Sequence, residues 1–140
     1  MPFLQTGTDS RTNLSVSVIV VSRTSRIMKH AQAHFSYNDA KGGTVHLAKF
    51  MSAEFQKVRG TMNSIAPKYF SSEMTAKDSG LDMKSELPAE KVQQKGRAPV
   101  QRAGRNEDMA QAVLFLAKNV HLNREVIAAD GGVLNVFAGR

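Results

Sequence analysis

A run of β-branched residues near the start of the chain limits the possible folds more than any other feature. Residues 14–22 read LSVSVIVVS, so an alternation of apolar and polar side chains gives way to four consecutive apolar residues. Alternation is typical of a strand with one buried face, whereas a continuous apolar run is typical of a strand buried on both faces. The sequence therefore predicts a strand that enters a parallel sheet and becomes buried within it.

A long helix is predicted after this strand and a polar connection, from about residue 36 to residue 59. Its apolar side chains recur at three- and four-residue steps, which is the period of a helix, and we expect them to face the core: Leu47, Phe50, Met51, Phe55 and Val58. Gly42 and Gly43 lie inside this helix, where each costs roughly 1 kcal/mol relative to alanine. Either another element packs closely against that turn, or the helix is weak there.

Two further strands and one further helix complete the predicted order. Residues 61–66 form a strand candidate that Pro67 ends, and residues 125–129 form the last strand. The helix between them spans residues 106–118, with Asn106 as its N-cap. Residues 68–105 are predicted to be irregular apart from one weak helix near residues 88–94. Alternating strands and helices predict an α/β fold with a parallel core of three strands, at about residues 15–22, 61–66 and 125–129.

Composition and charge exclude several classes of function. The 140 residues suffice for one domain and contain no cysteine, which excludes disulfides and thiolate chemistry. The four histidines show no metal-ligand spacing, so no metal site is predicted. The net charge is +7, but the basic residues are spread out and no aromatic residues interleave with them, so no nucleic-acid partner is expected. No apolar run approaches the ~20 residues that cross a bilayer, and a cytoplasmic protein without a membrane partner is expected.

Tyr37 and Lys41 are the residues most suggestive of chemistry. They are four apart on the predicted helix and therefore share one of its faces. A tyrosine is a poor acid or base near neutrality, but a nearby ammonium group favours the phenolate, and such a pair can exchange a proton with an alcohol or carbonyl oxygen. Ser22 falls at the carboxyl end of the first strand, where open α/β sheets bind ligands. The alternatives are a surface Tyr–Lys pair and a serine that bonds a nearby backbone group.

Four segments in order resemble the short-chain dehydrogenase/reductase family. The segment YNDAKGG at residues 37–43 is similar to the family's Tyr-x-x-x-Lys motif, and NSIAP at residues 63–67 is similar to the strand that follows it. Residues 102–117 resemble the family's late helix, and DGG at residues 130–132 resembles the end of its last core strand. The resemblance covers residues 14–132 and is closest to fungal polyol and sorbose reductase-like members. It implies an oxidoreductase that acts on a small carbonyl or secondary-alcohol substrate with NADP or NAD.

The resemblance also implies roles for individual residues. Tyr37 is the general acid/base, and Lys41 assists it and holds the nicotinamide ribose. Ser22 orients the substrate oxygen, although Thr24 and Ser25 are close rivals in the alignment. Pro67 and Ser72 lie along the nicotinamide. Catalytic residues Ser22, Tyr37 and Lys41, and cofactor-binding residues Tyr37, Lys41, Pro67 and Ser72, are therefore expected at one site.

The sequence departs from the family's pattern in several places. The glycine-rich turn that cradles the dinucleotide pyrophosphate has no counterpart in the 140 residues, and neither has the Asn-Ala-Gly motif. Lys68, Ser25 and Arg124 stand where the family often has glycine. We therefore expect a partial Rossmann-like parallel sheet that lacks the N-terminal dinucleotide-binding half, with residues 1–13 as an N-terminal loop or remnant and residues 14–140 as a C-terminal half-domain.

Three functions remain open at the level of sequence. The first is an oxidoreductase impaired by truncation, and the second is a catalytically inactive remnant. The exposed sheet edge of a half-domain favours pairing with another chain, so this remnant is expected to persist through self-association, as a homo-oligomer. The third is a basic module that binds an anionic partner.

Overall fold

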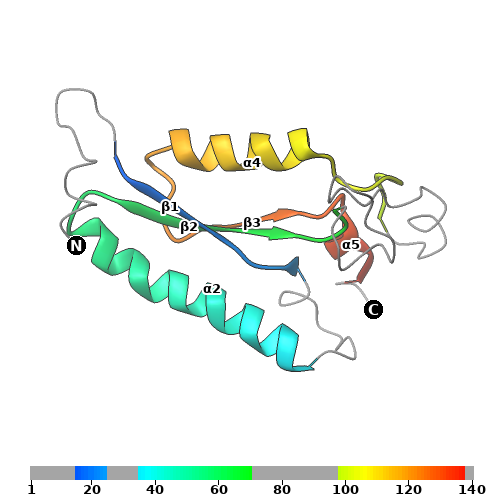
Figure 1. The fold of residues 1–140 in the computed structure, drawn as a ribbon, viewed down its shortest axis with the longest axis horizontal. Helices are drawn as coiled ribbons and strands as arrows, with labels where there is room; N and C mark the ends of the chain where they lie inside the picture. Colours follow the sequence, from blue (N-terminus) through cyan, green and yellow to red (C-terminus); the bar gives the residue numbers. More distant parts are fainter. Residues whose placement is uncertain (1–14, 25–34, 71–97, 138–140) are drawn as a thin grey trace, which may run out of the picture.

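Three parallel strands lie between two helices in the computed structural model, which describes residues 15–24, 35–70 and 98–137. The elements in chain order are β1 (Ser17–Val21), α2 (Phe35–Gln56), β2 (Thr61–Pro67), α4 (Asn106–Lys118), β3 (Val126–Ala129) and α5 (Val133–Phe137). The strand order is β1-β2-β3, and both pairings are parallel. Helix α2 covers one face of the sheet and α4 covers the other (Figure 1). The predicted parallel α/β fold is confirmed.

The central strand is β2, and it carries most of the buried residues of the sheet. All its residues from Thr61 to Ala66 are buried, whereas Ser17–Val20 of β1 are only half-buried and Val21 is 51% exposed. The prediction that the first strand is buried on both faces was therefore wrong. Within the described residues β1 pairs only with β2, and α2 packs chiefly over β2, so the flank of β1 is left uncovered.

Helix α2 has the predicted period, and of the expected core residues Phe55 is buried and Met51 packs partly buried against the core, but the rest of the buried set differs. Its buried residues are Val45, Ala48, Ser52 and Phe55, whereas Leu47 and Phe50 are 58% and 67% exposed. The small side chains of Ala48 and Ser52 let the helix approach the sheet, where Phe55 packs with Met62. Apart from the adjoining residues and the backbone of α2 itself, no described atom lies within 4 Å of a Cβ built on Gly42 or Gly43. The glycines therefore accommodate no close neighbour there, and the helix runs through them without interruption.

A matched pair of phenylalanines tests which face of α2 is buried. Phe55→Ala is expected to lower the free energy of unfolding by about 3–5 kcal/mol, because Phe55 is 4% exposed and its removal leaves a cavity. Phe50→Ala, the control on the same helix, is expected to change it by less than about 0.5 kcal/mol. Urea denaturation followed by circular dichroism measures both. Equal effects of the two substitutions would contradict this packing of α2.

The turn after β3 starts a short helix that the sequence did not indicate. The Asp130 carboxylate accepts hydrogen bonds from the N–H groups of Gly132 at 2.9 Å and Leu134 at 2.8 Å, so it caps α5. Gly131 and Gly132 adopt φ values of 64° and 87°, which side chains with a Cβ rarely adopt. Arg124, just before β3, has a φ of 69°. The positive φ at residue 124 favours glycine, which is common at this position in the family that the sequence resembles.

None of the described helices is both long enough and apolar enough to cross a lipid bilayer.

Candidate active site

The carboxyl ends of the three strands lie side by side at one end of the sheet, which we call the carboxyl edge, and α2 begins beside it (Figure 1). Tyr37 lies in the first turn of α2, and Lys41 lies one turn later. The Lys41 Nζ atom donates a long hydrogen bond of 3.4 Å to the main-chain oxygen of Val21, the last residue of β1. The same Nζ atom lies 6.0 Å from the centroid of the Tyr37 ring. Lys41 therefore links the end of β1 to the face of the tyrosine.

Two hydroxyl groups follow β1, and each donates to a main-chain oxygen. Ser22 is 3% exposed, and its hydroxyl donates to the main-chain oxygen of Lys41 at 3.0 Å. Thr24 is fully buried, and its hydroxyl donates to the main-chain oxygen of Pro67 at 3.4 Å. Each hydroxyl oxygen can still accept a hydrogen bond. The bond of Ser22 is the one expected of a structural serine, and a contact between Ser22 or Thr24 and the Tyr37 hydroxyl stays a prediction.

Pro67 is the last residue of β2 and pairs with Ala129 of β3, so it lies at the same edge as Ser22, Tyr37 and Lys41. Ser72 and Ser25, also singled out from the sequence, lie outside the described residues, as does the weak helix expected near residues 88–94. The part of the chain that the structure describes holds no group of three or more His, Cys, Asp or Glu side chains able to bind a metal ion.

Two cationic side chains, Arg23 and Lys68, belong to this edge although the sequence reasoning gave them no role. The Arg23 guanidinium carbon lies 5.5 Å from the centroid of the Tyr37 ring. Its Nε atom is buried and has no hydrogen-bond partner among the described residues. The adjacency of Arg23 to Ser22 was the signal available in the sequence, and Lys68 was noted only as a replacement for glycine.

Lys68 is 6% exposed, and its Nζ atom lies 5.7 Å from the centroid of the Tyr69 ring. Burial and the charge of Arg23 lower the pKa of Lys68 to about 8, and the charge of Asp130 acts in the opposite direction. Asp130 already holds the start of α5. Counted over residues 15–24, 35–70 and 98–137, the edge therefore has more positive than negative charge beside the two tyrosine rings.

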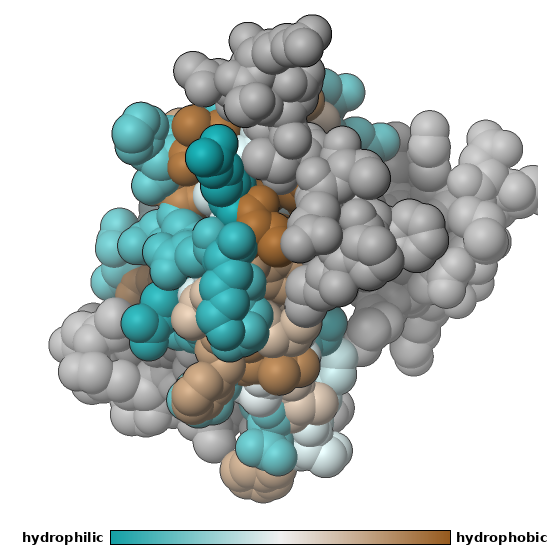
Figure 2. Space-filling view, turned by 90° about the vertical axis from the view of Figure 1, so that its left-hand side faces the viewer, coloured by the Kyte–Doolittle hydropathy of each residue, from teal (hydrophilic) through white to brown (hydrophobic). Residues whose placement is uncertain are grey.

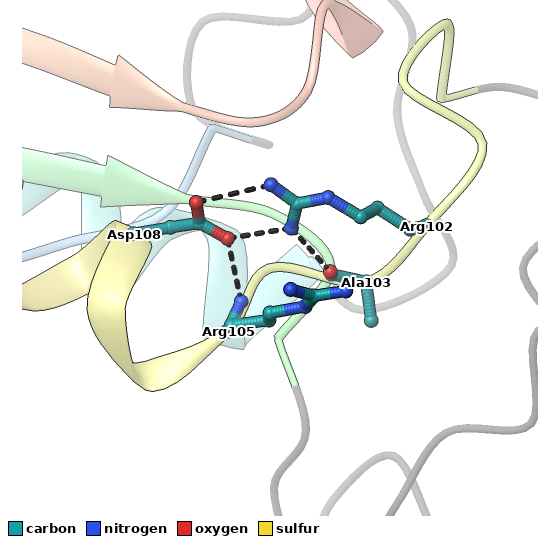
Figure 3. A network of polar contacts seen from close by, with 4 residues as sticks. All are labelled: Arg102, Ala103, Arg105 and Asp108. Atoms are coloured by element: carbon teal, nitrogen blue, oxygen red, sulfur yellow. Dashed lines mark hydrogen bonds and ion pairs between the residues drawn. The ribbon is translucent and has the colours of Figure 1, made fainter.

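A pocket of about 370 Å³ opens beside the carboxyl end of β3, and an ion pair lies in its wall. The Arg102 guanidinium donates to both oxygens of Asp108, at 2.6 and 3.0 Å, and also to the main-chain oxygen of Ala103 (Figure 3). Asp108 additionally accepts a hydrogen bond of 2.7 Å from the N–H of Arg105. The N-cap of α4 is Arg105, so the predicted cap at Asn106 was wrong by one residue. The carboxylate of Asp108, within the first turn, binds the N–H at the cap position instead.

The acid stability of the protein is expected to depend on Asp108. The hydrogen bond from Arg102, followed by the one from the Arg105 N–H, holds the pKa of Asp108 well below its ordinary value of 3.8. A carboxyl whose pKa is lowered by folding stabilises the folded state above its unfolded pKa, and this contribution is lost as the pH falls toward the folded value. The melting temperature of the wild type should therefore fall more steeply below about pH 4 than that of Asp108→Asn. Parallel slopes for the two proteins between about pH 6 and pH 2 would contradict the ion pair.

The sequence matches a family of known enzymes over residues 9–134, the family described as enoyl-(acyl carrier protein) reductase. A short-chain dehydrogenase/reductase of Diaporthe leptostromiformis is 29% identical over 139 residues, which are 97% of this chain and 46% of that protein. The sorbose reductase of Candida albicans is 32% identical over 86% of this chain and 41% of that protein. An NADP-dependent mannitol dehydrogenase of Hypocrea jecorina is 30% identical, again over 41% of its length. The chain thus spans less than half the length of these relatives.

Solved structures show the same fold over about half their length. The NADP complex of RhlG from Pseudomonas aeruginosa superposes with a TM-score of 0.75 at 25% identity and covers 95% of this chain and 51% of that one. The structure of ElxO with NADP bound gives a TM-score of 0.69 at 21% identity, over 96% and 50% of the two chains.

Proposed function

Because the chain belongs to the short-chain dehydrogenase/reductase family of oxidoreductases, we propose that Tyr37 exchanges a proton with the oxygen of a small carbonyl or secondary-alcohol substrate. Lys41 assists Tyr37 electrostatically, and Ser22 or Thr24 orients the substrate oxygen. A nicotinamide cofactor, NADP or NAD, supplies or accepts hydride when bound. We further propose a cytoplasmic location, in line with a chain that has no cysteine.

The observation that carries this proposal is the position of Lys41. Its Nζ atom is tied to the last residue of β1 and faces the Tyr37 ring at 6.0 Å. A tyrosine and an ammonium group are thereby held together at the carboxyl edge of a parallel sheet, which is where such sheets bind ligands. A cation fixed beside a phenol attracts the negative charge that develops on the phenolic oxygen while its proton is transferred.

The orienting hydroxyl has two candidates on one short segment. Ser22 and Thr24 both donate their proton to main-chain oxygens, of Lys41 and Pro67 respectively. To donate to a substrate carbonyl, either hydroxyl has to turn away from its backbone partner. Ser22 loses a bond of 3.0 Å, whereas Thr24 loses a weaker one of 3.4 Å but is fully buried. Both residues are buried, at 3% and 0% exposed, so exposure does not decide between them.

The described residues fit one part of the cofactor. Positively charged Lys41, Arg23 and Lys68 lie at the edge that Pro67 also borders, and the buried Arg23 Nε atom has no bond to any other described residue. These three cationic side chains can bind the phosphate of a phosphorylated nicotinamide group. The 140 residues have no glycine-rich turn for the pyrophosphate and adenosine. Pro67, Tyr37 and Lys41 would therefore border the nicotinamide end alone, with Ser72 as a further contact expected from the sequence.

Deuterium transfer tests the proposed function even when turnover is slow. The chain is incubated with NADPH deuterated at C4 of the nicotinamide and with simple ketones or ketoses, and the product alcohol is analysed by mass spectrometry. Deuterium at the carbinol carbon, above the amount found without protein, is the expected result. Label at the level of the protein-free control would reject the proposal and leave the second candidate function.

The second candidate is a non-enzymatic protein that associates with itself. Exposed apolar side chains on α2 favour it, because Leu47 and Phe50 are 58% and 67% exposed and Phe35 is 71% exposed. At the opposite end of the sheet from the candidate site, the surface mixes hydrophilic and hydrophobic residues (Figure 2). Sedimentation equilibrium tests the idea: a homo-oligomer weakened by Phe50→Ser is expected, and a monomer at all concentrations would exclude it.

A further inference from the structure

We propose that Arg23 and Lys68 together form an oxyanion-binding subsite beside Tyr37, which takes a phosphate or carboxylate group of the molecule bound at the carboxyl edge. The inference rests on the proposed function, since it concerns a ligand of the same site. Neither residue is among those that the family resemblance assigns to catalysis or cofactor binding. The subsite therefore adds two residues to the candidate site.

Backbone contacts bring the two residues to the same place. The N–H of Ser22 donates to the main-chain oxygen of Ile65 at 2.8 Å, which continues the pairing of β1 and β2 beyond the end of β1. Two residues later in each strand extension, the Thr24 hydroxyl donates to the main-chain oxygen of Pro67. Arg23 lies between these two contacts, and Lys68 directly follows the second. Two extensions of neighbouring parallel strands thus carry one cation each to the same edge.

The charges of Arg23 and Lys68 act against each other. Lys68 is buried and is close enough to Arg23 for that charge to disfavour its protonated form. The nearby carboxylate, Asp130, binds the N–H groups of Gly132 and Leu134 with its two oxygens. Like charges in a partly desolvated place repel one another strongly, and a bound anion between them reverses the sign of the interaction.

The unused hydrogen-bonding capacity of Arg23 points to the same ligand. Its Nε atom is buried and has no acceptor in the described part of the chain, and an orphaned buried donor costs free energy. The guanidinium lies over the Tyr37 ring, with its carbon atom 5.5 Å from the ring centroid. A planar guanidinium matches carboxylate and phosphate oxygens, to which it donates two parallel hydrogen bonds. The proposed oxyanion would give Nε an acceptor and would place a negative charge beside Lys68.

The oxyanion has two chemically equivalent sources. Arg23 follows Ser22, a candidate for orienting the substrate, so a carboxylate on the substrate would lie within its reach. Lys68 follows Pro67, which is expected along the nicotinamide, so a phosphate next to the nicotinamide ribose would lie within reach of Lys68. The experiment below compares the two sources through pairs of ligands that differ in the anionic group alone.

The two tyrosines provide the readout, because the chain contains only Tyr37 and Tyr69 and each ring lies near one of the cations. The chain is labelled with 3-fluorotyrosine, and ¹⁹F NMR is recorded in a buffer free of phosphate, sulfate and carboxylates. One titration pair is nicotinamide mononucleotide against nicotinamide riboside, which lacks the phosphate. The other is acetoacetate against its methyl ester, which lacks the charge. Saturable shifts of both resonances are expected with at least one anionic member, and no saturation with its neutral counterpart; the member that saturates identifies the source.

Charge-neutralising variants then assign the subsite. Arg23→Gln and Lys68→Gln are each expected to weaken the anion's affinity by about tenfold or more, the usual effect of losing a hydrogen bond to a charged group. Lys68→Arg should retain most of the affinity. Lys118→Gln removes the same charge from the exposed end of α4 and should leave the affinity unchanged. Circular dichroism checks that each variant is folded, and the ligand pairs remain decisive on the wild type alone.

Two results would overturn the subsite: shifts that stay linear for both anionic ligands, or equal affinities for the wild type, Arg23→Gln and Lys68→Gln. Failure of the proposed catalytic function has a different signature. In that case the anion still binds and the two variants still weaken it, but no deuterium is transferred from the labelled cofactor.

Discussion

At physiological salt, the 140-residue chain on its own is expected to bind NADPH with a dissociation constant in the millimolar range or weaker, and to reduce ketones only very slowly. Hydride transfer requires the nicotinamide to be held in register with the substrate, since positioning supplies much of the rate. In the family to which the chain belongs, a glycine-rich turn grips the pyrophosphate, and these 140 residues have no such turn. Arg23, Lys41 and Lys68 supply attraction for a phosphate, but salt screens the exposed part of that attraction.

Isothermal titration calorimetry with NADPH and NADH, at low and at physiological salt, measures the two dissociation constants. Ketone and ketose reduction is followed in parallel by cofactor absorbance. Affinity should fall as salt is raised, because the interaction is mainly electrostatic. Micromolar affinity at physiological salt, together with turnover that Tyr37→Phe abolishes, would show that the dinucleotide is held in another way, for example by a partner subunit.

Tyr37→Phe is expected to lower any deuterium transfer by about 10²–10⁴-fold, the usual contribution of a positioned general acid or base. The variant keeps the ring and its contact with Arg23 and removes only the hydroxyl that carries the proton. Lys41→Met should also lower deuterium transfer, since it removes the cation that faces the Tyr37 ring at 6.0 Å. Cofactor binding should weaken in Lys41→Met but not in Tyr37→Phe.

Ser36→Ala is the matched control, because it removes an exposed hydroxyl from the residue next to Tyr37 on the same helix. Its deuterium transfer should equal that of the wild type under the assay conditions used to test the proposed function. Equal label in the product from Tyr37→Phe and Ser36→Ala would exclude Tyr37 as the proton donor. Loss of label in both would point to disruption of the start of α2 instead.

The site combines a predicted pair with two residues that were not assigned a role. Tyr37 and Lys41 could be identified from sequence because their spacing on one helix is a local property. Arg23 and Lys68 are far apart in the chain, and their proximity depends on how β1 and β2 pair and on the bond between Thr24 and Pro67. Spacing along the sequence carries no information about that register, so the excess of positive charge at the edge could be recognised only in three dimensions.

By itself the sequence determined the type and order of the main elements, since each depends on a local pattern. The β-branched run gave β1, the three- and four-residue period gave α2, and their alternation with two more strands required a parallel sheet. Only the tertiary structure decided which side of each element is buried. Leu47 and Phe50 have the hydrophobicity of core residues, but the smaller Ala48 and Ser52 lie against the sheet, because close approach of a helix depends on the shape of what it meets. The exposure of Val21 likewise depends on which strands flank β1, and no pattern within β1 records its neighbours.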